Sequence, residues 1–462
     1  MSNQIPPKQT TLKTIVDFCR RKGFVYPGSE IYGGLANTWD FGPKGVLLRN
    51  NIEQAWRNHF INSRTDMVEI NSGIFMNSKA WEASGHLAGF SDCLVDDKLT
   101  GHRFRADHLI EEALGIDVEG WSVEEITKTI HENKIKNPLT GKEGDWTEAR
   151  YMNLMFESNR DKIGNDPNQK IYLRPETAQG MFVQFKNIVQ SERKKLPFGV
   201  GQVGKAFRNE ISPGNFIFRV IEFEQMEIEY FIKPPTNDQE WNEHFEMWLQ
   251  LQWSFLTNQI GLQETNLQYK EHSTEKLSHY SKRTCDINYN FPFGFSELTG
   301  NAYRTDFDLS QHQKYSGVDL TYFDAENNSR YIPHVIEPTV GLDRLMLAVL
   351  CDFYSEQILE DGEIRTYLKF PASLAPYKYA ILPLMKKDGL SEKATEIYIS
   401  LKKRGISCDY DESGSIGKRY RRQDENGTPY CICIDYDTLE DGTVTLRDRD
   451  TMEQKRVKIE EL

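Results

Sequence analysis

The chain has 462 residues, and at about 150 residues per domain this length favours about three domains. Apolar residues make up 38% and aromatic residues 12%, which excludes a disordered chain because such chains have few aromatic residues. The formal charge of −13 argues against a protein that coats nucleic acid non-specifically, but it allows a local basic site.

Two helices are predicted in the first third of the chain. One starts at Pro43, because proline is tolerated in a first turn and apolar residues at helical spacing follow it. Those apolar residues are Leu48, Ile52, Ala55, Trp56 and Phe60. The other starts at Ser122, where Glu125 three residues later completes a capping-box pattern.

The later elements suggest two further regions. Val220–Ile232 has the composition of a strand, and Leu342–Phe353 has the apolar spacing of an amphipathic helix. Beyond Pro371 and Pro376, which interrupt the pattern, a β-α-β alternation predicts a small α/β domain. We therefore divide the chain into four segments, which are 1–85, 86–150, 151–372 and 373–462.

Several features favour a cytoplasmic protein with no membrane segment. The apolar run Leu345–Cys351 is far shorter than the ~20 residues that span a bilayer. The segment MSNQIPPKQT at 1–10 lacks a basic stretch followed by an apolar one, so we expect no secretory signal. The seven cysteines include no CxxC and the ten histidines no HExxH, so we expect reduced thiols and no zinc.

The glycine-rich run Gly199–Ala206 matches GxGxxG and nearly matches GxxxxGK[ST]. Both patterns bind phosphate by opening a helix whose N–H groups are free. Here Ala206 lacks the hydroxyl that would hold Mg²⁺, and Pro213 and Gly214 argue against a following helix. We predict a strand whose small residues allow a close neighbour.

Four carboxylates crowd the strand after this run. Glu222 and Glu224 are predicted to share one face, and Glu227 and Glu229 the other, because alternate strand residues point the same way. Carboxylates this close repel one another unless some meet a cation, such as a substrate ammonium, Mg²⁺ or an arginine. For some of them the alternative is a solvated face of an edge strand.

Three segments resemble the motifs of one enzyme class. FRNE at 207–210, a turn and the strand at 218–231 resemble motif 2 of class II aminoacyl-tRNA synthetases. EPTVGLDR at 337–344 resembles motif 3, and the segment Trp39–Pro43 resembles motif 1. The three motifs occur in the order found in that class, and the whole arrangement covers nearly the full length of the chain.

Longer strings are similar to the glycyl-tRNA synthetase family of the homodimeric type. They are IYGGLANTWDFGPKG at 31–45, WEASGH at 81–86, RADHLIE at 105–111, LRPETAQG at 173–180, FRNEISPGNFIFR at 207–219 and GKRYRRQDE at 417–425. The resemblance implies an α+β fold, with an antiparallel sheet flanked by helices in the catalytic domain and a C-terminal α/β anticodon-binding domain. It places motif 1 in 1–85, an insertion in 86–150, motifs 2 and 3 in 151–372 and the anticodon-binding domain in 373–462.

The family activity implied by the resemblance is that of a glycine–tRNA ligase. Such an enzyme activates glycine with ATP and Mg²⁺ to glycyl-adenylate and transfers it to the 3′ end of tRNA(Gly). Arg208 and Arg344 are the catalytic candidates, since fixed arginines can stabilise charge on the α-phosphate and hold the γ-phosphate. Phe223 would stack on adenine, and Glu297 would contact Mg²⁺. The ATP-binding candidates are Arg208, Asn209, Glu210, Phe218, Arg219, Phe223, Glu297, Leu298, Gly341, Asp343 and Arg344.

The implied glycine site is rich in carboxylates, which suits a small zwitterion. Its candidates are Arg105, Glu176, Glu222, Phe223, Glu224, Gln225, Glu227, Arg304, Glu337, Thr339 and Gly341. Because glycine is the smallest amino acid, steric exclusion can reject the others, and no segment resembles an editing domain.

For tRNA, the candidates are Lys418, Arg419, Tyr420, Arg421 and Arg422. Basic groups can contact phosphate while an aromatic ring stacks on an unpaired base. The alternative for such a charge run is a solvated helix face.

The chain departs from the family pattern in places. Some relatives bind zinc through two cysteine pairs, but the matching stretches here, 97–108 and 137–144, contain no cysteine, so we expect no structural zinc. Thr339 stands where serine is usual, Ile221 where arginine is frequent, and Phe295 where tryptophan is found.

Two other functions stay open at this point. One is a non-catalytic synthetase-like subunit that binds nucleic acid, such as the accessory subunit of mitochondrial DNA polymerase. Such relatives tend to lose their ATP-binding arginines, whereas Arg208 and Arg344 are present here. The other is a class II synthetase for a different amino acid, against which the WEASGH and RPETAQG strings argue.

Overall fold

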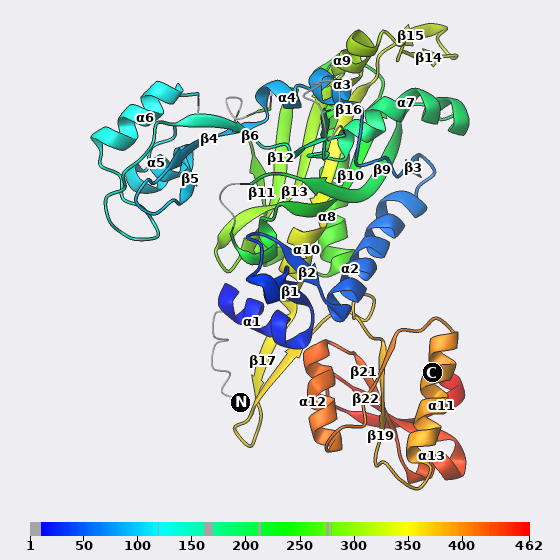
Figure 1. Ribbon diagram of the computed structural model, residues 1–462. Helices are drawn as coiled ribbons and strands as arrows, with labels where there is room; N and C mark the ends of the chain where they lie inside the picture. The colour runs from blue at the N-terminus through cyan, green and yellow to red at the C-terminus, as the bar shows by residue number, and fades with distance from the viewer. Residues whose placement is uncertain (1–10, 119, 161–169, 211–213, 274–276, 279) are drawn as a thin grey trace.

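A computed structural model describes residues 11–118, 120–160, 170–210, 214–273, 277–278 and 280–462. Its centre is a seven-stranded sheet of order β11-β12-β13-β16-β10-β9-β3 (Figure 1). Neighbouring strands are antiparallel, except that β3 runs parallel to β9. The strands are β3 Met67–Glu69, β9 Phe198–Phe207, β10 Glu222–Ile232, β11 Leu267–Glu271, β12 Arg283–Phe291, β13 Gly294–Thr305 and β16 His334–Gly341.

Helices cover both faces of this sheet. The main core lies on the face covered by α2 (Pro43–Trp56), α8 (Asp238–Ser254) and α10 (Leu342–Phe353). A second cluster joins α7 (Ala178–Glu192) and α9 (Phe307–Ser316) to the opposite face. The period of two along β10 decides this division, because Met226 and Ile228 belong to the first cluster and Phe231 to the second.

The helix predicted to start at Pro43 and the helix predicted over Leu342–Phe353 are both confirmed, as α2 and α10. Pro43 is the first residue of α2, which continues as a π-helical turn over Arg57–Asn62. The strand predicted from Val220 begins at Glu222 instead, because Ile221 pairs its N–H with the carbonyl oxygen of Asn37.

The glycine-rich run is strand β9, as predicted, and opens no helix. A Cβ atom on Gly201 would lie 2.6 Å from a side-chain atom of Ile61, and one on Gly204 would lie 2.4 Å from Arg174. Small residues are therefore needed here for close packing and not for phosphate binding.

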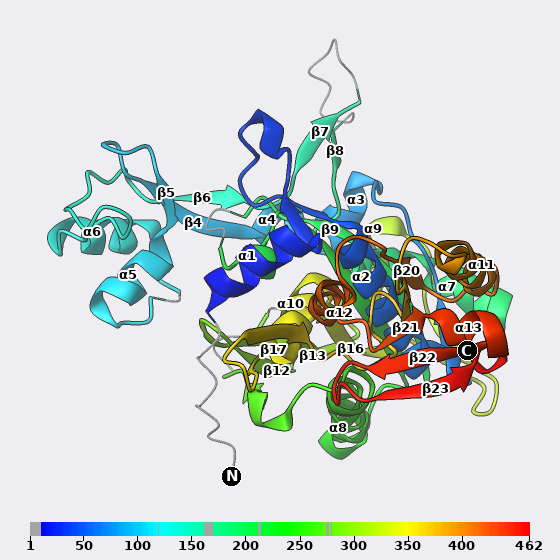
Figure 2. The same cartoon turned by 90° about the horizontal axis from the view of Figure 1, so that it is seen from below.

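Residues between Cys93 and Ala149 form a core of their own, away from the main sheet (Figure 1; Figure 2). Its strands are β4 Ser91–Asp96, β5 Arg103–Arg105 and β6 Arg150–Asn153, and its helices are α5 Ala106–Leu114 and α6 Val123–Glu132. The capping box of Ser122 and Glu125 is present at the start of α6.

The C-terminal part is a five-stranded sheet of order β20-β19-β21-β22-β23 with a separate core. β19 runs parallel to β20 and β21, as the β-α-β pattern predicted. The elements are β19 Tyr379–Pro383, α11 Leu390–Lys403, β20 Cys408–Tyr410, α12 Ile416–Asn426, β21 Tyr430–Ile434, α13 Tyr436–Asp441, β22 Thr443–Asp448 and β23 Gln454–Lys458.

Smaller elements connect these parts. They are α1 Leu12–Lys22, β1 Val25–Pro27, β2 Trp39–Phe41, α3 Ser78–Ala83, α4 His86–Gly89, β7 Glu157–Asn159, β8 Lys170–Tyr172, β14 Tyr322–Asp324, β15 Ser329–Tyr331, β17 Tyr354–Ile358 and β18 Ile364–Leu368. Among the described residues, no helix has both the length and the apolar character needed to cross a bilayer.

Candidate active site

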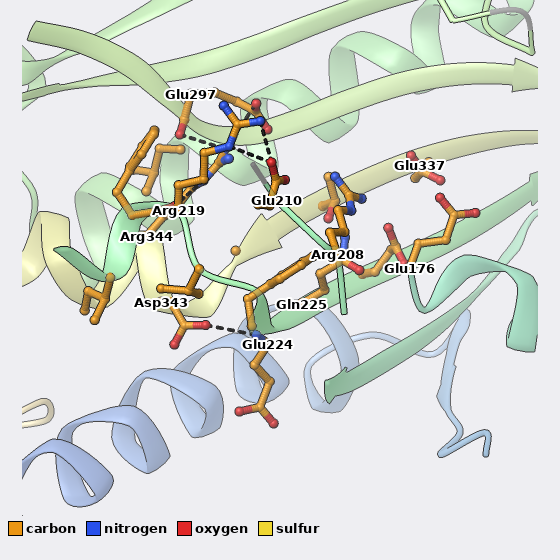
Figure 3. A pocket seen from close by; sticks show the side chains of 18 of the residues that line it. Glu176, Arg208, Glu210, Arg219, Glu224, Gln225, Glu297, Glu337, Asp343 and Arg344 are labelled. Carbon is orange, nitrogen blue, oxygen red and sulfur yellow. Dashed lines mark hydrogen bonds and ion pairs between the residues drawn. The ribbon is translucent and has the colours of Figure 1, made fainter. Parts of the chain in front are cut away.

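A pocket opens on the sheet face where β13, β16 and β10 lie side by side (Figure 3). The segment 217–220, just before β10, and Tyr280 also contribute to its wall. Most of the predicted ligand-binding residues line it. They are Glu176, Arg208, Glu210, Phe218, Arg219, Phe223, Glu224, Gln225, Glu227, Glu297, Leu298, Glu337, Thr339, Gly341, Asp343 and Arg344.

Arg208 is fixed in the pocket wall just beyond the end of β9. Its backbone N–H donates to the carbonyl oxygen of Ile221 (3.0 Å), and its Nε donates to that of Pro175 (3.0 Å). Its guanidinium carbon lies 5.3 Å from the ring centre of Phe223 and 5.4 Å from that of Phe90. These contacts orient a positive group beside an aromatic ring, which suits a nucleotide phosphate next to a base.

Arg344 lies at the first turn of α10 on the same side of the pocket. Its Nε donates to the carbonyl oxygen of Phe218 (3.2 Å), and its guanidinium carbon lies 4.5 Å from the Phe218 ring centre. Its Nη1 is 3.1 Å from Glu297 Oε2, and the charge of Arg344 lowers the pKa of Glu297. A second pair, Arg219 and Glu210, lies nearby at 2.6 Å (Figure 3).

The opposite part of the pocket is acidic. Glu176, Glu227 and Glu337 line it, and Arg304 lies beside them with 1% of its surface exposed. Arg304 Nη1 donates to Glu337 Oε2 at 2.5 Å, and Nη2 is 4.0 Å from Glu176 Oε1. The same guanidinium donates to both oxygens of Asp308, at 2.7 and 2.9 Å. One buried arginine thus holds several carboxylates in place.

These carboxylates differ in their proton affinity. Burial raises the pKa of Glu227 to about 7, and the charge of Glu176 adds to this effect. Burial also raises the pKa of Glu337 to about 8, although the charge of Arg304 opposes it. Burial acts on Glu176 as well, but His86 at 3.4 Å and Arg304 outweigh it and hold the pKa of Glu176 well below its usual range. A bound cation would therefore displace protons from this cluster.

Glu229 lies behind this cluster on the same face of β10 as Glu227, as the alternation predicted. One oxygen each of Glu227, Glu229 and Glu337 fall within 4.8 Å of one another. Burial raises the pKa of Glu229 well above its usual value, and within the described part of the chain its carboxylate oxygens make no hydrogen bond. Such oxygens suit a small cation, either an ammonium group or a hard metal ion.

Two predicted glycine-binding arginines lie outside the pocket lining. Arg105 ends β5, in the part of the chain with its own core between Cys93 and Ala149, and pairs with Asp92 (3.3 Å) and Asp107 (2.5 Å). The charge of Glu210 in the pocket wall also acts on Arg105 and helps to raise its pKa, and the expected contact of Arg105 with substrate stays a prediction. Arg304 lies beneath the pocket and acts on its wall through Glu337.

Three other residues that were predicted to bind ATP or glycine lie outside the pocket or pair with other side chains. Glu222 is exposed at the first position of β10 and pairs with a lysine of β9. Asn209 is outside the lining, and its N–H donates to the carbonyl oxygen of Leu154 (2.7 Å). Glu224 touches the pocket, but its carboxylate points away toward α2 and pairs with Arg49 (Figure 3).

The predicted tRNA-binding cluster on α12 is not a continuous exposed patch. Lys418 is exposed, but Arg419 has 3% of its surface exposed and donates to two carbonyl oxygens. Tyr420 packs against the C-terminal sheet. Arg421 and Arg422 are half-buried and each pair with an aspartate. The expectation is wrong for Arg419, because helical spacing turns it toward the core.

Several functional neighbours were not identified from the sequence. His86, Tyr280 and Asp308 contact the site, and Arg49 joins two of its walls. His86 ends the WEASGH string, which could have indicated a role. The other three carry no local signal, because their partners are distant in sequence.

The three residues that depart from the family pattern lie at different places relative to the pocket. Thr339 lines the pocket, and a Cβ atom on Gly300 of the neighbouring strand would lie 3.3 Å from its Cγ2. Ile221 supplies a backbone carbonyl to Arg208 and does not line the pocket. Phe295 is exposed at the start of β13.

Family models match two parts of the chain. Residues 156–353 match the tRNA synthetase class II core domain (G, H, P, S and T), and residues 378–462 match the anticodon binding domain. The antiparallel sheet and its arginine- and glutamate-lined pocket are thus those of a class II tRNA synthetase core.

Similarity to curated proteins identifies the family within this class. Glycine–tRNA ligase of Clostridium kluyveri is 52% identical over 99% of this chain and 98% of its own length. The proteins of the same name from Clostridium acetobutylicum and Caldanaerobacter subterraneus are 53% and 52% identical, over 98% and 99% of this chain and 97% and 98% of their own lengths. The chain belongs to the glycine–tRNA ligase family.

Proposed function

We propose that the pocket binds ATP and glycine side by side, forms glycyl-adenylate and transfers the glycyl group to the 3′ end of tRNA(Gly). One observation carries the proposal: a single pocket has Arg208 and Arg344 in one part and Glu176, Glu227 and Glu337 in the other. The first part suits a polyphosphate, and the second suits an ammonium group.

In the activation step, a carboxylate oxygen of glycine attacks the α-phosphorus of ATP and pyrophosphate leaves. Negative charge grows on the α-phosphate oxygens, and Arg208 is placed to stabilise it. Arg344 would hold the γ-phosphate. Its present partner Glu297 would then be free to contact the Mg²⁺ that accompanies ATP.

The acidic part of the pocket would hold the glycine ammonium group. Glu176 is the carboxylate that stays charged, while Glu227 and Glu337 lose their protons when the ammonium binds. A larger amino acid would need space next to Thr339, whose methyl group takes up room that serine would leave open. Steric exclusion of this kind supports selection of glycine.

The experiment that tests this function is ATP–pyrophosphate exchange with each of the twenty amino acids, without tRNA. Exchange with glycine alone is the expected result. Exchange with another amino acid would keep the class II chemistry but contradict the glycine assignment. Absence of exchange from folded protein with Mg²⁺ would favour the non-catalytic subunit, an alternative that the comparisons do not support.

We further propose the segment roles, with motif 1 in 1–85, an insertion in 86–150, motifs 2 and 3 in 151–372 and an anticodon-binding domain in 373–462. We also propose a cytoplasmic homodimer with motif 1 at the interface. Light scattering on the purified chain tests the dimer. A mass near twice 53.7 kDa is expected, and a mass near 53.7 kDa would contradict it.

We propose Mg²⁺ as the only metal required and no protein-bound zinc. The stretches 97–108 and 137–144, where some relatives have cysteine pairs, contain none. Elemental analysis after dialysis against a chelator tests this proposal. Full exchange activity should return with Mg²⁺ alone, and a requirement for added zinc would contradict it.

A further inference from the structure

A fully buried carboxylate on α12, that of Asp424, contacts the catalytic part of the chain. Asp424 has no exposed surface, and its Oδ2 accepts a hydrogen bond from Arg365 Nε at 2.8 Å. Arg365 is also fully buried and belongs to β18, outside the C-terminal sheet. On the other side, Arg447 of β22 donates to Asp424 Oδ1 at 2.8 Å. Arg421, on the same helix, lies 3.5 Å from Asp424 Oδ2. Asp424 is therefore shared between two arginines of its own domain and one of the hairpin β17–β18.

The hairpin is itself anchored to the catalytic core. Arg365 Nη1 donates to Gln357 of the paired strand β17 at 3.1 Å. Leu368 and Phe370, at the end of the hairpin, belong to the main hydrophobic core. The backbone of Arg365 thus belongs to a hairpin anchored in the catalytic part, while its guanidinium reaches into the C-terminal domain.

Four further contacts surround this pair. Arg449 donates to the carbonyl oxygen of Phe370 at 2.9 Å, and Arg365 Nη2 donates to the carbonyl oxygen of Arg449 at 2.5 Å. Gly427, which ends α12, approaches so closely that a Cβ atom would lie 2.5 Å from the Phe370 ring. Lys22 of α1 pairs with Glu425. Both figures of the whole molecule place α12 on the side of the C-terminal domain that faces α1 and β17 (Figure 1; Figure 2).

We propose that Asp424 is a positioning residue, which fixes the C-terminal domain on the catalytic core at the angle that tRNA requires. The inference rests on the proposed function, because it assumes that one tRNA contacts both parts at once. It assigns to the GKRYRRQDE string a role different from that of a tRNA-binding surface.

The physical reason is the directionality of buried ion pairs. A hydrophobic contact tolerates sliding, but a carboxylate shared by guanidinium groups of two domains is satisfied in one arrangement. Rotation of the domain would leave Arg365 buried without its carboxylate, which is costly. The shared pair therefore selects one orientation among those that the apolar contacts alone would allow.

The test uses the full chain with Arg365→Met, which keeps most of the side-chain volume and leaves Asp424 its pairs with Arg447 and Arg421 inside the C-terminal domain. Asp424→Asn is the second variant. Arg283→Met is the matched control, since Arg283 on β12 pairs with Glu271 and Glu246 within the catalytic part. Each protein is measured for glycine-dependent ATP–pyrophosphate exchange, for aminoacylation of transcribed tRNA(Gly) and by small-angle X-ray scattering.

We expect exchange to stay within about two-fold of the unchanged chain while kcat/KM for tRNA falls by about ten-fold or more, the usual size of coupling between separate sites. The scattering curve should show a larger maximum dimension for Arg365→Met and Asp424→Asn but not for the control. Equal loss in exchange and aminoacylation, or no change in aminoacylation and scattering, would overturn the proposal. If the unchanged chain shows no exchange, the proposed function fails, and scattering alone decides the role of Asp424.

Discussion

Arg49, on the first long helix of the core, donates a hydrogen bond to Asp343 at the first turn of the last helix of the core. The two residues are 294 positions apart in the chain. The same guanidinium contacts Glu224, and the Glu224 N–H donates to Asp343 Oδ2 at 2.9 Å. The helix that follows the motif 1 segment thus meets the segments that resemble motifs 2 and 3 at one buried arginine.

Removing this arginine should disturb the pocket without touching any ligand. Arg49→Gln leaves two carboxylates without their cation, and breaking a buried pair in this way costs about 3–5 kcal/mol of stability. We expect a lower melting temperature and a fall in kcat/KM for ATP of at least about ten-fold, because misplaced groups lose much of their effect. The control is Arg57→Gln on the same chain segment, whose ion pairs with Glu53 and Glu69 are partly exposed. Equal effects of both substitutions would contradict the role of Arg49.

Arg208 should matter far more for the rate than for stability. Arg208→Ala removes the group placed against the α-phosphate, and loss of one such donor lowers kcat by about 10²–10³-fold. Arg150→Gln, which breaks an ion pair with Asp96 far from the pocket, serves as the control. Exchange kinetics at saturating glycine measure both. An unchanged kcat for Arg208→Ala would rule out its catalytic role.

Glycine binding should become tighter as the pH rises. The folded pKa values of Glu227 and Glu337, about 7 and about 8, lie above the ordinary value, so the unliganded protein holds these protons near neutral pH. The stability that these two groups contribute is present at low pH and is lost as the pH rises through those values. An ammonium ion favours the charged carboxylates, so KM for glycine should fall between about pH 6 and 8.

Calorimetry provides a direct check of this linkage. At pH 7, glycine binding should release protons, and the measured heat should then depend on the ionisation enthalpy of the buffer. Glu337→Gln removes one titrating group and should reduce the release. Heat that is the same in all buffers would show that the carboxylates are already charged before glycine binds.

Gly300 and Thr339 should behave as a coupled pair. A methyl group added by Gly300→Ala would meet Thr339 Cγ2 at 3.3 Å, and overpacking of this kind costs about 1–3 kcal/mol. We expect Gly300→Ala to raise KM for glycine. The double variant Gly300→Ala with Thr339→Ser should restore much of the activity, because serine lacks the methyl group.

Thr339→Ser alone tests specificity. If the methyl group limits the space for a side chain, exchange with alanine should increase relative to glycine by up to about 10–200-fold, the value of one methylene in a pocket. The measurement is the ratio of kcat/KM for alanine to that for glycine. An unchanged ratio would mean that another part of the wall excludes alanine.

Much of the fold follows from local patterns in the sequence. Pro43 and the apolar residues at helical spacing after it predicted α2, and the Ser122–Glu125 pair predicted the start of α6. The alternation along β10 correctly placed Glu227 and Glu229 on one face. These features depend on neighbours within a few residues, which are visible in a sequence.

What the tertiary structure decided is which charged residues are available to a ligand. Arg419 and Glu224 were expected to face tRNA and glycine, but Arg419 is bonded to backbone oxygens, and Glu224 is held by Arg49. An arginine or glutamate has the same sequence signature whether its partner is a substrate or another residue. Its partner is set by packing between segments hundreds of residues apart, and only the folded chain brings those segments together.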